Sequence, residues 1–190
     1  MSAAYAPAPE RPSAPAPRWA RRVALAVVVC VLPSALWRMS VVVTGPWCDP
    51  ELSTFEKKWP SSPLEQPYLV FLSLLQVSAG LAAFGLVERW GEVAPRWVPF
   101  VGGKTLSVRA VVTAAAIGTA MLFLIEGYGI LNSIFEFRPP HEEPSCVMPK
   151  SGARVTLLKV LYAPLLVWPA LMAVLTVAYW RRRTRPAAQD

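Results

Sequence analysis

The chain has 190 residues, a formal net charge of +7 and a mean hydropathy of +0.39; 54% of its residues are hydrophobic and 16% are charged. Water-soluble domains carry about 25% charged residues, so this composition excludes an ordinary soluble domain and favours lipid as the solvent. The basic residues gather at the ends of apolar runs. This placement is typical of membrane proteins and argues against a nucleic-acid-binding face.

Residues 1–17 form an Ala, Pro and Ser-rich segment whose only charges are Glu10 and Arg11. Such a segment buries too little apolar surface to offset the entropy of ordering, so it predicts a disordered cytoplasmic tail. The alternative is a Pro-rich ligand that docks in an aromatic groove of another protein.

Four apolar runs follow within a predicted transmembrane domain at 18–183, and a second cytoplasmic tail is expected at 184–190. Each run is close to the ~20 residues that cross a hydrocarbon layer of ~30 Å. Backbone groups in hydrocarbon must bond within their own segment, so each run predicts a helix. The expected fold is all-α, with four antiparallel transmembrane helices. The predicted spans are 23–43, 68–87, 108–131 and 157–180.

The first run has a second interpretation, as a cleaved signal peptide. Arg21 and Arg22 precede it, and Pro33-Ser34-Ala35 resembles a cleavage site. The apolar stretch continues past that site to Val43, which favours a transmembrane helix.

The distribution of Lys and Arg predicts the orientation of the spans. The N-terminal flank, the middle loop and the C-terminal tail are basic, whereas the loops at 44–67 and 132–156 mix acidic and basic residues. Basic loops stay on the cytoplasmic side. The sequence therefore predicts a multi-pass protein of the cell membrane with both termini in the cytoplasm.

The middle loop repeats an Arg-Trp pair at Arg89-Trp90 and Arg96-Trp97. Indole rings favour the level of the headgroups, and arginine binds phosphate, so the loop is expected to lie on the cytoplasmic surface of the membrane. The alternative is a gate or a docking surface for a soluble partner.

Three cysteines are present, of which Cys30 lies inside the first run and is expected to be a small packing residue. Cys48 and Cys146 fall in the two predicted outer loops, on the oxidising side of the membrane. They predict a structural disulfide, with two free thiols as the alternative. A membrane thiol oxidoreductase would also need a reactive pair such as Cys-x-x-Cys, which the chain lacks.

Arg38 and Glu126 are charged residues inside the first and third predicted spans. Both lie near the outer end of their span, so they predict an intramembrane salt bridge or a hydrogen-bond network with Tyr128, Asn132 or Lys159. The alternative is that each side chain extends separately to the outer surface.

The remaining polar and proline residues predict no catalytic, cofactor-binding or metal site. His141-Glu142-Glu143 offers one imidazole and two carboxylates, and the other ligands that a metal site requires are missing. Pro164 and Pro169 predict a bend in the fourth span.

Three segments carry a resemblance: Leu36-Trp37-Arg38, the loop from Arg89 to Pro99 with Gly102-Gly103, and Tyr179-Trp180-Arg181-Arg182. With them the chain resembles uncharacterised small polytopic membrane proteins of high-GC Gram-positive (actinobacterial) bacteria. The resemblance implies topology and compartment, and it implies no activity.

These observations predict a non-enzymatic membrane protein that acts as an accessory or partner-binding subunit. Its expected partners are the lipid bilayer and a second membrane protein or another copy of the chain, and no nucleic acid. The alternatives are a small transporter or permease component that uses Arg38 and Glu126, and a membrane thiol-redox protein.

Overall fold

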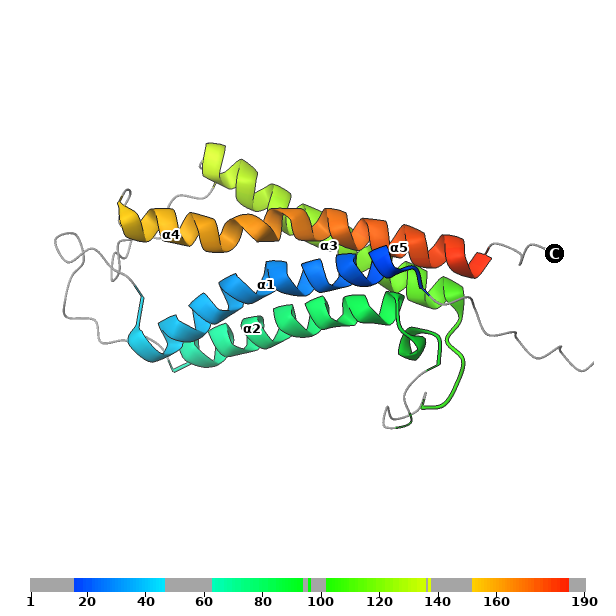
Figure 1. Ribbon diagram of the computed structural model, residues 1–190. Helices are drawn as coiled ribbons and strands as arrows, with labels where there is room; N and C mark the ends of the chain where they lie inside the picture. The colour runs from blue at the N-terminus through cyan, green and yellow to red at the C-terminus, as the bar shows by residue number, and fades with distance from the viewer. Residues whose placement is uncertain are drawn as a thin grey trace, which may run out of the picture.

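The computed structural model describes residues 16–46, 63–93, 96, 102–135, 137 and 152–184. In these ranges every regular element is helical, and four helices are long and apolar enough to cross a membrane (Figure 1). They are α1 (Arg18–Thr44), α2 (Glu65–Ala82) continued by the 3-10 turn η1 (Ala83–Leu86), α3 (Val108–Phe135), and a fourth helix. The fourth consists of α4 (Ala153–Tyr162), the 3-10 turn η3 (Ala163–Val167) and α5 (Trp168–Thr184). The predicted all-α fold with four apolar helices is confirmed.

The helix α1 is longer than its predicted span because helical hydrogen bonds continue beyond the apolar residues. It begins directly after Pro17, whose fixed φ of −64° suits the residue before a helix, and it ends at Gly45, which has a φ of 81°. Pro33 lies inside the helix without ending it, as is common in membrane helices. Ser34, next to it, is buried.

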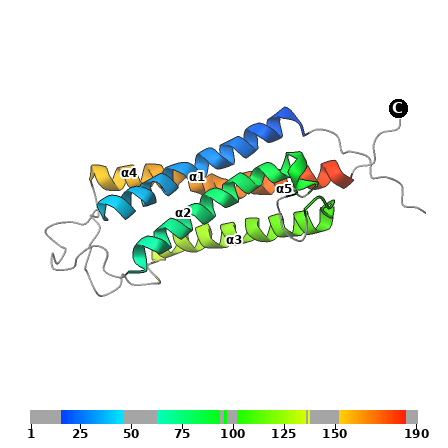
Figure 2. The ribbon, with the colours of Figure 1, turned by 90° about the horizontal axis from the view of Figure 1, so that it is seen from below.

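The helix α2 runs antiparallel to α1. Gln66 at the start of α2 donates a hydrogen bond to the carbonyl of Val42 at the end of α1 (3.0 Å). Further along, Gln76 Nε2 donates to Val31 O (3.1 Å) and to Ser34 Oγ (2.8 Å). As the residue numbers of the contacts rise along α2, those of their partners in α1 fall, so the two helices run in opposite directions (Figure 2).

The fourth helix changes its winding where the sequence predicts a bend. Between α4 and α5 the backbone tightens into η3, with Pro164 near its start and Pro169 just after its end. Proline has no N–H to donate to the preceding turn, so the regular α-helical bonding pattern is interrupted there. The fourth helix therefore consists of two α-helical halves that a short 3-10 segment joins.

The buried core joins α1, η1, η3 and α5. It includes Val27 and Val31 of α1, Ala83 of η1, and Leu175 and Tyr179 of α5. Gly80 of α2 lies so close to Val31 that a Cβ at Gly80 would meet the Val31 Cγ2 atom at 2.8 Å. The lack of a side chain at Gly80 allows this close approach, as at many helix contacts in membranes.

The helix α3 is peripheral. It packs against α5, and Thr119 is the one residue of its 28 that is buried. Figure 1 shows its C-terminal half diverging from α4. Large apolar side chains are exposed on every long helix, among them Leu25, Leu74, Leu124 and Val160. Such extensive exposed apolar surface is expected where lipid or another protein covers it.

Candidate functional site

The start of α1, the η1–η2 segment, the start of α3 and the end of α5 meet at one end of the bundle (Figure 1), where η2 is the 3-10 turn Arg89–Gly91. We call this end the basic end. The described basic residues in these segments are Arg18, Arg21, Arg22, Arg89, Arg96, Lys104, Arg109, Arg181, Arg182 and Arg183. The acidic residues are Glu88 and Glu92 alone among those described there. The excess of basic residues gives this end a positive electrostatic potential.

Glu92 holds the end of α5 against the loop after η2. Its Oε1 lies 3.2 Å from Arg182 Nη2, and its Oε2 lies 3.6 Å from Arg183 Nη1. The three side chains are 12 to 16% exposed, so solvent screens these ion pairs less than it screens surface pairs. Arg182 Nη2 also donates a weak hydrogen bond to Leu86 O (3.4 Å).

Tyr179 links the buried core to this charged layer. Its side chain is 1% exposed, and its hydroxyl donates to Gly91 O at 3.1 Å. The Arg182 guanidinium lies 5.6 Å from the centre of the Tyr179 ring, within the range of a cation–π contact. Gly91 in turn packs on the backbone of Gly85, where a side chain at Gly91 would overlap the Gly85 carbonyl.

The middle loop lies partly within the described residues. Arg89 and Arg96 are exposed, and Trp90 is 43% exposed with one edge of its ring against Gly85. Trp97 lies outside the described residues. Arg21 of α1 joins the segment before η2 through Glu88, at 2.8 Å, although the Arg21 side chain is 60% exposed. An ion pair that exposed contributes little to stability.

Arg38 and Glu126 do not form the predicted ion pair. Arg38 Nε donates to the hydroxyl of Tyr162 at the end of α4 (3.2 Å), and its guanidinium lies 5.7 Å from the centre of that ring. Trp37 packs edge-on against the same ring, with 5.7 Å between centroids. Glu126 belongs to α3, which packs on α5, so the assembly of the helices gives Arg38 a different partner.

Glu126 itself is half-buried on α3. Within the described part of the chain its carboxyl group has neither an ion pair nor a hydrogen bond to another residue. It lies one and two turns beyond Leu122 and Thr119, which face α5 and the core. By this spacing Glu126 is on the inner face of α3, in the C-terminal half of the helix. Figure 1 shows this half of α3 diverging from α4.

The predicted disulfide between Cys48 and Cys146 lies outside the described residues, as does His141-Glu142-Glu143. Cys30 is half-buried in α1 as a free cysteine. Among the described residues, no group of His, Cys, Asp and Glu is arranged to hold a metal ion.

Sequence reasoning missed two parts of this arrangement. One is Tyr162, the actual partner of Arg38, and the other is Glu92, which binds two arginines of α5. The sequence held a signal for the role of Glu92, since Glu92 is one of two described carboxylates at the basic end, where α5 ends in three arginines. Comparison with family models, with curated proteins and with solved structures returned no match.

Proposed function

We propose that this chain is a multi-pass protein of the cell membrane with four antiparallel spans and both termini in the cytoplasm. The four long apolar helices and their outward-facing apolar side chains support membrane insertion. The basic end, which carries both described chain ends, supports the orientation, because clustered Lys and Arg remain on the cytoplasmic side. The described charges at the opposite end are few and mixed: Arg38, Arg154, Lys159, Glu65 and Glu126.

We further propose that the protein is a non-enzymatic partner-binding subunit, and that α3 is the helix that binds the partner. The observation that carries this proposal is Glu126, an ionisable side chain inside an apolar helix with no partner among the described residues. A carboxyl group in hydrocarbon is costly unless it is paired, so such residues mark functional positions. The occupant that fits is a transmembrane helix with a basic or hydrogen-bond-donating side chain at this depth.

The surroundings of Glu126 suit such a helix. Ile130, one turn further along the same face, is 45% exposed, and a Cβ at Gly127 or Gly129 would meet no atom within 4 Å. Small residues let a second backbone approach closely, and hydrogen bonds across helices then add to the packing. The C-terminal half of α3 thus combines exposed apolar side chains, small residues and a carboxyl group.

Photocrosslinking along α3 tests this function. We would place p-benzoylphenylalanine at Ile130, on the Glu126 face, and at Leu124, which lies ~200° around the helix from Glu126. Leu124 is the matched control because it is apolar, 73% exposed and on the same helix. Irradiation of native membranes should give a discrete protein adduct from Ile130 and not from Leu124.

The change Glu126→Gln decides whether the carboxyl group takes part. It removes the charge and keeps the shape, and the fold should survive because the Glu126 side chain has no partner to lose among the residues that the structure describes. The adduct at Ile130 should fall strongly while the thermal midpoint of the purified protein stays the same. An adduct with a second tagged copy of the chain would identify the partner as the protein itself. Equal labelling at Ile130 and Leu124, or an adduct indifferent to Glu126→Gln, would refute the proposal.

The alternative function, a small transporter or permease component, draws support from the 3-10 interruption in the fourth helix. Interrupted helices line substrate pathways in some transporters. However, Gln76 and Ser34, two buried polar residues where α1 meets α2, are bonded to each other and to Val31 O. Side chains held in this way act as links between helices, which favours the partner-binding function.

A further inference from the structure

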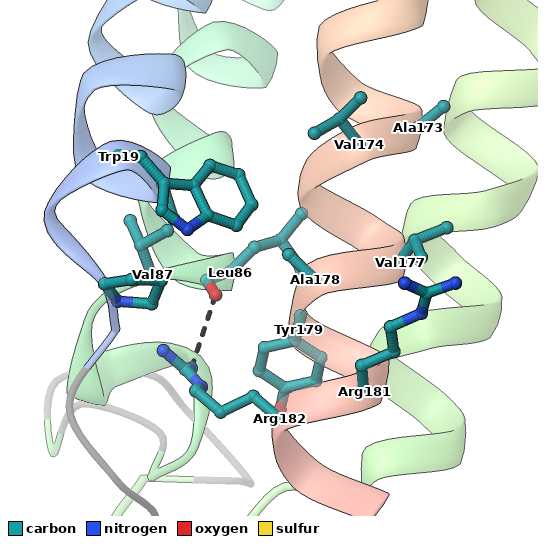
Figure 3. Close-up of a pocket in the computed structure, with 12 residues that line it drawn as sticks. Trp19, Leu86, Val87, Ala173, Val174, Val177, Ala178, Tyr179, Arg181 and Arg182 are labelled. Carbon is teal, nitrogen blue, oxygen red and sulfur yellow. Dashed lines mark hydrogen bonds between the residues drawn. The ribbon is translucent and has the colours of Figure 1, made fainter.

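A groove opens at the basic end between α1, η1 and α5. Its volume is about 590 Å³, within the range of ~300–1,000 Å³ that holds small ligands. Figure 3 shows Trp19 of α1 on one side, Leu86 and Val87 at the end of η1, and α5 on the other side. The groove is therefore built from three segments that are distant in sequence.

The polarity of the lining changes along α5. Ala173 and Val177 lie one turn apart, and Arg181 follows after another turn, so one stripe of the helix passes from apolar to basic. The small side chains leave space along the helix, and Trp19, 48% exposed, forms the opposite edge near the basic end. A ligand that fills this groove must be apolar along its length and anionic at one end.

The two arginines of the groove have different roles. Arg182 is already held, because its Nη2 atom binds Leu86 O and Glu92 Oε1. Arg181 is exposed, and its guanidinium has no ion pair and no hydrogen bond within the described residues. Its guanidinium can thus bind an incoming anion without breaking a contact that holds the fold together.

We propose that this groove binds an anionic phospholipid of the cytoplasmic leaflet. One acyl chain lies along Val177 and Leu86, and the headgroup phosphate binds Arg181, with the indole of Trp19 at the level of the headgroup. The charge complementarity supports a lipid, because basic pockets between transmembrane helices on the cytoplasmic side bind anionic headgroups. The inference rests on the proposed membrane insertion and orientation.

Native mass spectrometry of the full-length protein in detergent tests the site. The probes are dioleoyl phosphatidylglycerol and dioleoyl phosphatidylcholine, which have the same chains and differ in headgroup charge. The wild type should retain phosphatidylglycerol preferentially, and Arg181→Gln should weaken that binding about five-fold, as expected for the loss of one arginine at a membrane surface. The matched control is Arg154→Gln in α4, at the opposite end of the fourth helix, which should leave the binding of phosphatidylglycerol unchanged.

A second variant tests the apolar part of the groove. Val177→Trp fills the space, and the fold should tolerate it because Val177 is 43% exposed. It should reduce retention of both lipids. Excess inorganic phosphate should not displace phosphatidylglycerol, since phosphate lacks the chain that the groove holds. Displacement by phosphate, equal retention of the two lipids, or equal effects of Arg181→Gln and Arg154→Gln would overturn the inference.

Carbonate extraction of membranes separates this inference from the proposed function. Release of the wild-type protein by carbonate would refute membrane insertion, and the lipid site would fall with it. Retention in the membrane without selectivity for phosphatidylglycerol would refute the lipid site alone.

Discussion

Gln76 is the residue whose replacement best tests the contact between α1 and α2. Its side chain is 9% exposed, and its Nε2 atom donates to Val31 O and Ser34 Oγ across the helix interface. Gln76→Leu keeps nearly the same volume and removes both hydrogen bonds. Val31 O keeps a side-chain donor, because Ser34 Oγ also donates to it at 3.2 Å.

The expected loss of unfolding free energy follows from the number of hydrogen bonds that Gln76→Leu removes. Hydrogen bonds between membrane helices average about 0.6 kcal/mol and reach about 1.7 kcal/mol, so two of them give about 1–2 kcal/mol of unfolding free energy. Leucine adds little to offset this loss, since lipid is as apolar as the interface. We would measure it by titrating the purified protein from mild detergent into dodecyl sulfate and following helix content.

The control is Ser133→Ala on α3. The Ser133 hydroxyl is exposed and donates only to Ile130 O of its own helix, so its removal should change the unfolding free energy by less than about 0.5 kcal/mol. If Gln76→Leu destabilised the protein no more than Ser133→Ala, or stabilised it, the hydrogen bonds of Gln76 would not hold α1 and α2 together.

Two further predictions concern the basic end and the opposite end of the bundle. Gly91→Ala should destabilise the protein by about 1–3 kcal/mol, because the new side chain overlaps the Gly85 backbone. The control Gly118→Ala, in open space on α3, should be neutral or stabilising by up to about 1 kcal/mol. Equal thermal midpoints for the two variants would contradict the close contact between Gly91 and Gly85. A double-mutant cycle with Arg38→Gln and Tyr162→Phe should give a coupling energy of about 0.5–1.5 kcal/mol, and additive effects would show that the bond between them contributes nothing.

The four helices could be predicted from the sequence because their signal is local. A long apolar run with few charges must form a helix if it lies in lipid, whatever its neighbours do. The observed bounds differ from the predicted ones: α1 begins at Arg18 where the predicted span begins at 23, and α3 extends to Phe135 where the predicted span ends at 131. Hydropathy marks the apolar part, whereas the helix continues into polar residues that bond in the same way.

The clustering of basic residues at one end of the bundle could also be predicted, because it depends only on which ends of the apolar runs carry Lys and Arg. The exact contacts there were not predictable. Glu92 could have paired with any of several arginines, and its choice of Arg182 and Arg183 depends on how the loop after η2 folds back onto α5. The Tyr179–Gly91 bond depends on the same folding, which brings together residues 88 positions apart.

The sequence by itself thus determined the number of apolar helices, their approximate positions and the basic end. Only the tertiary structure decided which helices touch and which face each one presents. The physical reason is that each residue along a helix turns the side chain by ~100°, so small differences in rotation exchange a buried face for an exposed one. That is why Arg38 meets Tyr162 rather than Glu126, and why the Glu126 carboxyl group on the peripheral helix α3 has no partner among the described residues.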